Sequence, residues 1–223
     1  GNAPGSSPGF ATCGMLLGAA RGDHRSAYDL GQVGLALSER LDDQELRAMI
    51  ALLVGCFIDP WRRPVRESFP LLDRAFRGCL ESGSMAYAGA SAVMIVWLRF
   101  IAGEELHGLL ERARQHFELQ ISMNVRDLGY FIAALMRGML LLAHGALPAA
   151  YASWEDERTF VEEQVRYPPA VNAHHVVSLE VAYLFGDLSW AEESAAKAGA
   201  GLSSNFSHIV AVEHSYYHGL LLA

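Results

Sequence analysis

Five turns marked by glycine or proline recur along the chain at nearly constant spacing. Successive turns lie 37 to 44 residues apart. They are Gly22-Asp23, Asp59-Pro60, Gly103-Glu104, His144-Gly145 and Gly186-Asp187. Each turn separates an apolar segment with helical periodicity from a more polar one. A repeat of this length is typical of helical-hairpin arrays, in which each hairpin packs on its neighbours. The spacing therefore favours an all-helical repeat architecture.

The segments between the turns carry apolar residues at three- and four-residue intervals, which predicts about eleven antiparallel helices. No segment alternates with period two over a useful length, so we expect no sheet. The fold class is all-α, an α-solenoid with a right-handed superhelix. Residues 1–9 are rich in Gly, Pro and Ser and are expected to form a flexible leader. Residues 10–223 are expected to form a single helical-repeat domain.

Three local patterns add detail to this expectation. Gly31 and Gly34 lie inside a helical pattern, where each glycine costs about 1 kcal/mol relative to alanine, so we expect a neighbouring helix to approach closely there. Ser153 to Asp156 resembles a capping box that opens a helix ending near Arg166. The last helix is expected from about Asn205, and the chain is still apolar at its final residues. This pattern predicts a fragment of a longer chain that self-associates through its last helix.

Composition excludes several classes of protein. The net charge is -8 and no basic block occurs, so neither nucleic acid nor an anionic membrane is an expected partner. The longest charge-free apolar run, Ala48 to Ile58, spans eleven residues and is too short to cross a bilayer. Cys13, Cys56 and Cys79 form no C-x-x-C pair, which predicts buried, reduced thiols in a cytoplasmic protein.

Lys197 is the only lysine, beside sixteen arginines. With the high Ala and Gly content, this bias is typical of a bacterial genome rich in G and C. Lys197 has no Walker A glycine frame around it, and a protein-kinase site needs its own strand lysine. The sequence therefore excludes a P-loop NTPase or a kinase in this chain. We expect no enzymatic activity and no cofactor.

The candidate binding residues are charges and histidines inside otherwise apolar helices. An unpaired buried charge is costly, so each must reach solvent or a partner. Each of these residues is therefore either a fold-specifying contact between helices or part of a binding groove. The groove candidates are Arg99, Arg137, His174, Glu180, Glu213 and His214.

A metal site is the remote alternative for the histidines. His214 and His218 are four residues apart and share a helical face, a spacing that can bind zinc. Residues 215 to 217 are Ser-Tyr-Tyr, so the H-E-x-x-H motif of zinc proteases is absent. The structural interpretation is that these histidines are half-buried packing residues, and we expect no metal. The alternative is a metal-dependent enzyme that uses His174, His214 and His218.

Several stretches together resemble a known family. They are residues 14–18 (GMLLG), 21–23 (RGD), 59–64 (DPWRRP), 66–72 (RESFPLL), 81–89 (ESGSMAYAG), 183–187 (YLFGD) and 212–217 (VEHSYY). Together they resemble the tetratricopeptide-like region of very large bacterial signalling proteins. In those proteins a serine/threonine kinase domain and an AAA/STAND-type ATPase precede the helical region. A GAF domain and a histidine kinase often follow it.

The resemblance covers the chain from about Phe10 and implies a function without catalysis, because catalysis in that family belongs to the flanking domains. The first hypothesis is a tetratricopeptide-like scaffold or regulatory module in signal transduction. Its partners would be other proteins or the flanking domains of the same chain. The second hypothesis is a sensing domain that binds a small-molecule effector in the groove of the superhelix.

Overall fold

A computed structural model describes residues 6–41 and 43–223, apart from the side chain of Gln164. The described part of the chain contains helices and no strand, which confirms the all-helical prediction. The contacts divide it into two compact units. Unit 1 comprises residues up to Gly103 with Ser207–Ile209, and unit 2 comprises Glu104–Phe206 and Val210–Ala223. The single domain expected over residues 10–223 stays a prediction, because a helical array can divide into contact clusters without dividing into domains.

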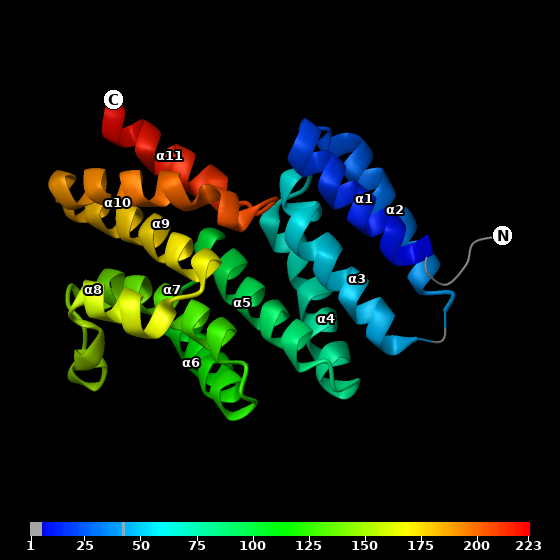
Figure 1. Ribbon diagram of the computed structural model, residues 1–223, viewed down its shortest axis with the longest axis horizontal. Coiled ribbons are helices and arrows are strands. Elements are labelled where there is room, and N and C mark those ends of the chain that lie inside the picture. Colours follow the sequence, from blue (N-terminus) through cyan, green and yellow to red (C-terminus); the bar gives the residue numbers. More distant parts are fainter. Residues whose placement is uncertain (1–5, 42) are drawn as a thin grey trace. The chain divides into compact units, whose positions relative to one another are not determined.

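Unit 1 is built from consecutive helices that pack in sequence order (Figure 1). The pair α1–α2 and the pair α3–α4 are antiparallel hairpins, and α5 packs on α4. Two short 3-10 turns, η1 and η2, connect α3 to α4. The bounds are α1 Ser6–Arg21, α2 His24–Ser38, α3 Gln44–Phe57, η1 Asp59–Trp61, η2 Val65–Ser68, α4 Phe69–Glu81 and α5 Met85–Ile101.

The predicted glycine turns have the backbone conformation that requires glycine. Gly22, Gly103, Gly145 and Gly186 have φ between 67° and 75°, a region that side chains with a Cβ rarely occupy. The fifth predicted turn, Asp59-Pro60, begins η1. The turn positions read from the sequence are therefore confirmed.

Glycines also let α1 and α2 approach each other closely. A Cβ on Gly14 would lie 2.7 Å from the backbone oxygen of Ala27, and a Cβ on Gly34 would lie 3.1 Å from that of Ser7. The close approach expected at Gly34 is confirmed. At Gly31 the neighbour is instead the side chain of Ile58, at 3.1 Å.

Helix α1 begins at Ser6, so residues 6–9 are helical although the sequence placed them in a flexible leader. The rest of that leader, residues 1–5, lies outside the described residues. Ser7 is buried and its hydroxyl donates to the backbone oxygen of Gly34 at 2.7 Å. Pro8 is tolerated because the first N–H groups of a helix have no intrahelical partner.

The core of unit 1 is mainly aliphatic. Its largest cluster joins Ala51, Leu52, Cys56, Leu72, Ala75, Met94, Ile95, Leu98 and Ile209. His208 is also buried, and its Nε2 lies 3.7 Å from Sγ of Cys56. Burial raises the pKa of Cys56 and lowers the pKa of His208 to about 4, so this neutral pair is no thiolate nucleophile. Cys79 is buried, but Cys13 is exposed, which corrects the expectation of three buried thiols.

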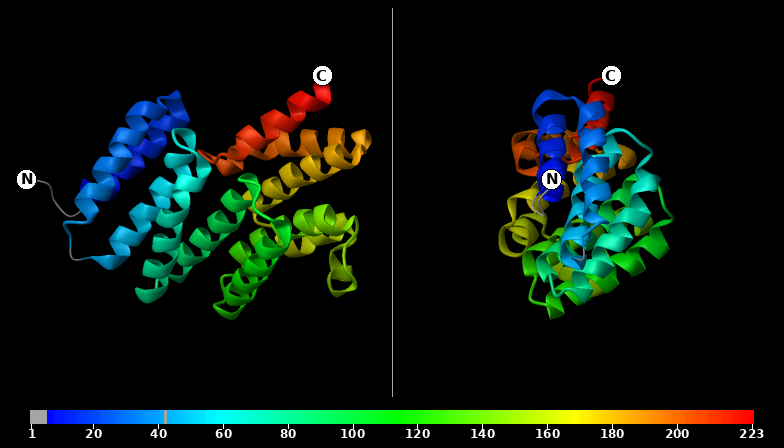
Figure 2. Two further views of the ribbon diagram at one scale, coloured as in Figure 1. Left: turned by 180° about the vertical axis from the view of Figure 1, so that it is seen from behind. Right: turned by 90° about the vertical axis from the view of Figure 1, so that its right-hand side faces the viewer.

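Unit 2 contains the remaining helices, of which α9, α10 and α11 lie side by side (Figure 2). Helix α7 packs on α6 and on α9. The helices are α6 Leu106–Ser122, α7 Arg126–His144, α8 Glu157–Thr159, α9 Pro168–Phe185, α10 Leu188–Gly201 and α11 Val210–Leu222. The shorter elements are the 3-10 turns η3 Ala149–Trp154 and η5 Leu202–Asn205 and the π-helical segment η4 Phe160–Val165.

Two segments of unit 2 differ from the sequence-based expectation. The helix expected from Ser153 to Arg166 is only the short α8, continued by η4, because Asp156 rather than Ser153 caps it by accepting from the Thr159 N–H at 2.7 Å. The last helix begins at Val210 instead of near Asn205. Asn205 is buried, and its amide donates to the Asn172 side chain at 2.8 Å, which holds that segment in a separate turn.

Helix α7 is long and apolar enough to cross a membrane by length and composition alone. The sequence contains no charge-free apolar run of that length here, because Arg137 interrupts the apolar residues. Within the structure, 61% of its most apolar window is buried. Core helices of globular proteins pass the same test, so this helix is weak evidence for a membrane span.

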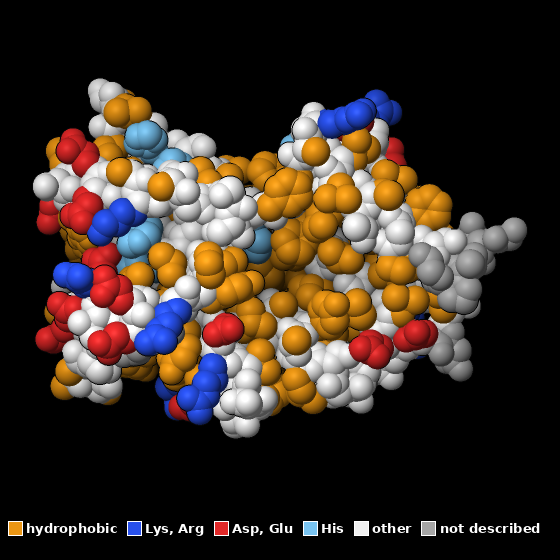
Figure 3. Space-filling view, in the orientation of Figure 1, with side chains coloured by type: hydrophobic (Ala, Val, Ile, Leu, Met, Phe, Trp, Pro, Cys, Tyr) orange, Lys and Arg blue, Asp and Glu red, His pale blue; other side chains and the backbone are white. Residues whose placement is uncertain are grey.

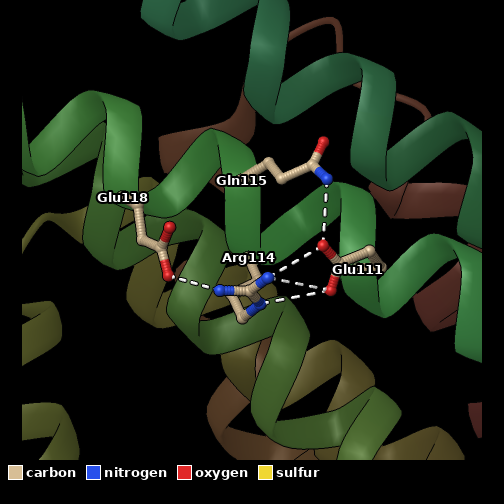
Figure 4. Close-up of polar contacts among 4 residues, drawn as sticks. All are labelled: Glu111, Arg114, Gln115 and Glu118. Carbon is tan, nitrogen blue, oxygen red and sulfur yellow. Dashed lines mark hydrogen bonds and ion pairs between the residues drawn. The ribbon is translucent and has the colours of Figure 1, made fainter.

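Helix α6 shows the polar outer surface of unit 2. Arg114 binds Glu111 and Glu118 at 2.8 and 2.7 Å, and Gln115 donates to Glu111 at 2.9 Å (Figure 4). These pairs are three or four residues apart, the spacing at which side chains meet on a helix. The four side chains form a ladder on the solvent side of α6.

Candidate functional site

The six residues singled out from the sequence fall into three places. Arg99 lies in unit 1, on α5. Arg137 and His174 lie close to one carboxylate in unit 2. The other three surround the contacts of α9 with α11 and of α10 with α11. They are Glu180, Glu213 and His214.

Arg99 is a paired structural residue of unit 1. Its guanidinium lies 3.3 Å from Oδ2 of Asp73 and stacks 4.4 Å from the ring centre of Phe69. Its side chain is 13% exposed. Both partners lie on α4, so the pairing joins α4 to α5. It leaves little of the charge of Arg99 available to a ligand.

Glu157 is the centre of the second group. Its carboxylate lies 3.0 Å from Nε2 of His174 and 4.0 Å from Nδ1 of His175. Asp156 caps α8 directly before it and fixes the backbone there. Arg137 is buried on α7, donates from Nε to the Trp154 backbone oxygen at 3.0 Å, and acts on Glu157 through its charge.

The environment sets the ionisation of this group. Burial opposes ionisation of Glu157, but hydrogen bonding to His174 and the positive charges of protonated His174 and of Arg137 outweigh it and lower the pKa of Glu157 to about 2. Burial lowers the pKa of His174, which is 1% exposed, and that of His175, which falls to about 4. At neutral pH the group therefore consists of an ionised carboxylate and two neutral imidazoles.

The group is no serine–histidine–carboxylate relay, although Ser178 lies nearby. Its hydroxyl is 3.4 Å from Nε2 of His174, the same nitrogen that contacts Glu157. A relay needs the nucleophile and the carboxylate on opposite ring nitrogens. Ser178 is also buried, so a substrate has no access to its hydroxyl.

A pocket of about 540 Å³ opens beside this group. It is lined by Glu157, Arg158, Val161, Glu162, His175, Glu193 and Lys197. Lys197 and Glu193 form an ion pair of 2.7 Å along α10. The pocket therefore presents charges of both signs beside an imidazole.

Sequence reasoning named His174 but missed Glu157. The two residues are 17 positions apart and lie on different elements, so no spacing rule joins them. A usable indication was the pair of adjacent histidines on one apolar helix, because each must find a polar partner when the helix is buried. The partner itself follows only from the tertiary contact between Glu157 and His174.

Glu180, Glu213 and His214 form the third group with Tyr217. The Tyr217 hydroxyl donates to Oε1 of Glu180 at 2.9 Å. Burial, and the nearby charge of Glu213, raise the pKa of Glu180 to about 7 in spite of that bond. Burial also raises the pKa of Glu213. Where α9 meets α11, burial therefore disfavours the ionised form of both carboxyl groups, and the charge of Glu213 adds to this effect on Glu180.

His214 has a packing role. It is buried and its Nε2 donates to the Ala195 backbone oxygen at 3.1 Å. Its ring lies 5.3 Å from that of His218. Among the described residues, the cluster that could hold a metal contains His174 with Glu157 and His175, and neither His214 nor His218. The metal trio considered from the sequence is therefore not brought together.

No protein-family model, curated protein or solved structure matches this chain.

Proposed function

We propose that the chain is a non-catalytic regulatory module of a bacterial signalling ATPase or kinase that works through protein–protein contacts. In this proposal the two units belong to one tetratricopeptide-like α-solenoid with a right-handed superhelix. The hairpin packing within each unit supports this arrangement, because neighbours in sequence are neighbours in space. The residue stretches that resemble the helical region of large signalling proteins support the signalling role.

The observation that carries the proposal is the exposed apolar face of α11. Val212, Tyr216 and Leu220 are spaced four residues apart and are 45%, 60% and 36% exposed. On the inner face of the same helix, Tyr217 and Leu221 pack against α9 and α10. A helix that is hydrophobic on two separate faces is typically buried on both. The outer face therefore lacks the neighbour that this composition favours.

The occupant that we propose for this face in the isolated chain is α11 of a second copy. A stripe with four-residue spacing is self-complementary when two copies meet about a two-fold axis. The chain carries a net charge of -8, but none of the three stripe residues is charged. The contact would therefore bring no like charges together at its centre. Two antiparallel copies of α11 would cover each other's exposed apolar stripe.

Self-association of the purified chain tests the proposal. We expect sedimentation equilibrium to show a concentration-dependent dimer. We expect Tyr216→Glu to abolish it, because the substitution places two like charges in the contact. Tyr87→Glu is the matched control, since Tyr87 on α5 is 43% exposed and lies outside the stripe. A wild-type chain that stays monomeric at every concentration, or a Tyr216→Glu variant that still dimerises, would contradict the proposal.

The pocket beside His175 favours a second function, the sensing of a small molecule. Its acidic and basic side chains suit a small ligand that carries both an ammonium and a carboxylate group. We expect free amino acids or similar zwitterions to raise the melting temperature of the chain. Lys197→Ala should remove that rise, whereas Arg25→Ala, at an exposed position of α2 in unit 1, should keep it. An equal response in both variants would exclude the pocket as the binding site.

A further inference from the structure

Three metal-ligand atoms converge in unit 2. A carboxylate oxygen of Glu157, one ring nitrogen of His174 and one of His175 all lie within 4.8 Å of one another. Two elements supply them, α8 for the carboxylate and α9 for both imidazoles. The centres of the two imidazole rings lie 5.2 Å apart, and the ring planes are inclined at 65°. Two consecutive residues of one helix can therefore aim their nitrogens at the same point beside Glu157.

The distances are close to those of a metal centre. Bonds of about 2.0–2.2 Å to nitrogen and oxygen place neighbouring ligand atoms about 3–3.6 Å apart. Glu157 and His174 lie at 3.0 Å in a hydrogen bond whose proton the metal would replace, and His175 at 4.0 Å must approach by about 0.5 Å. No hydrogen bond of Nδ1 opposes this movement, since that atom of His175 has no hydrogen-bond partner in the part of the chain that the structure describes.

An unpaired polar atom in such a place needs an explanation. Buried polar atoms are nearly always hydrogen-bonded, yet Nδ1 of His175 is buried beside an ionised carboxylate without a bond to it. A cation bound between them would satisfy the nitrogen and the second lone pairs of Glu157. The adjoining pocket, lined by Glu157 and His175, gives a path for the ion and room for a water ligand.

The donor set selects the class of cation. Two imidazoles and one carboxylate suit zinc and its neighbours, whereas calcium and magnesium take oxygen ligands. The positive charges of Arg137 and Lys197 act on the same histidines, which further disfavours cations that are held mainly by charge. We propose that Glu157, His174 and His175 bind one zinc-class divalent ion, with a water in the fourth position.

Metal titration of the purified full chain tests this site. After treatment with a chelator and its removal, calorimetry with zinc chloride should show one equivalent bound. Cobalt(II) should produce the visible absorption of a tetrahedral site with nitrogen ligands. His175→Ala and Glu157→Gln should each weaken zinc binding by at least about 100-fold, because each removes one of three protein ligands. This loss should exceed that caused by removing a residue that only hydrogen-bonds to a ligand. Glu157→Gln keeps an acceptor for His174 and so preserves the packing.

His218→Ala is the matched control. His218 pairs with His214 on α11, outside the proposed ligand set, so its variant should keep the stoichiometry and affinity of the wild type. Circular dichroism of each variant establishes that it is folded. The proposal is overturned if the wild-type chain binds no zinc with a defined stoichiometry. It is equally overturned if His175→Ala and Glu157→Gln bind as the wild type does, or if His218→Ala alone loses the ion.

Discussion

The two units use the same helical hairpins but bury different side chains. The clusters in unit 1 are mainly aliphatic, and its buried ionisable groups are Asp59, His208 and the thiols of Cys56 and Cys79. Unit 2 buries Arg137, His174 and His214 together with the Asn172 network. On the face shown in Figure 3, charged side chains also gather over unit 2, whereas hydrophobic ones are dense over unit 1.

This difference distinguishes the side chains that hold the hairpins together from those that could bind a ligand. Burying a polar group costs free energy unless it is hydrogen-bonded, so an aliphatic interior is sufficient to hold hairpins together. In unit 2 the buried polar groups accompany irregular backbone: Arg137 bonds the end of η3, and Asn172 bonds the segment around η5. The same unit contains the donor cluster, whereas pockets lined by charges of both signs occur in both units. We infer from the donor cluster that unit 2 is where a metal or its ligand would bind.

The two interior arginines give the largest expected effect. Arg137→Met should destabilise the chain by about 3–5 kcal/mol, because it leaves Glu157 without a compensating charge and the Trp154 oxygen without its donor. Arg99→Met in unit 1 should cost only about 1 kcal/mol, since its partner Asp73 is 39% exposed and can be solvated. Urea denaturation of both variants measures the difference. Equal losses would remove the distinction between the two units.

Buried carboxyl groups in the two units should respond to different pH ranges. The pKa of Glu180 is raised to about 7, so the folded state favours its protonated form. The resulting stability is present below pH 4.5 and is lost as pH rises through 7. Glu180→Gln mimics the protonated form and still accepts from Tyr217. It should match the wild type near pH 4 and exceed it by about 2–3 kcal/mol at pH 8.

Asp59→Asn is the control in unit 1. Burial raises the pKa of Asp59 to about 6, so the gain from its substitution should develop between pH 4 and 6 and be nearly complete by pH 7. Between pH 6.5 and 8 only the Glu180 variant should continue to gain on the wild type. Urea unfolding across this range checks which variant gains stability at the higher pH. A stability difference for Glu180→Gln that does not change with pH would contradict the raised pKa of Glu180.

Glycine contacts between helices should matter equally in both units. A Cβ on Gly14 would meet the Ala27 carbonyl at 2.7 Å, and one on Gly138 would meet Cγ1 of Val177 at 2.1 Å. Gly14→Ala and Gly138→Ala should therefore each cost about 1–3 kcal/mol. A Cβ on Gly219 would have nothing within 4 Å, so Gly219→Ala should be neutral or slightly stabilising. Thermal unfolding of the three variants compares them, and a stabilised Gly138→Ala would show that α7 and α9 can separate without cost.

The elements that could be read from the sequence are those fixed by local chemistry. The turn at Gly186 was predictable because a positive φ demands glycine within a helical pattern. The start of α8 was not predictable, because both Ser153 and Asp156 are residue types that can cap a helix. In the structure Asp156 is the cap, and local sequence does not distinguish the two. Arg137 and His174 could be identified as buried polar groups needing partners. Their common neighbour Glu157 could not, because it follows only from the tertiary contact between Glu157 and His174.

The smallest expected effect is on the polar surface of α6. Arg114 bridges Glu111 and Glu118 (Figure 4), but its side chain is 45% exposed. Exposed ion pairs gain little because water and salt screen them and long side chains lose freedom. Arg114→Ala should therefore leave the melting temperature within the scatter of replicate scans. A clear decrease at low salt that disappears at high salt would show that the surface charges of unit 2 stabilise it together with its polar interior.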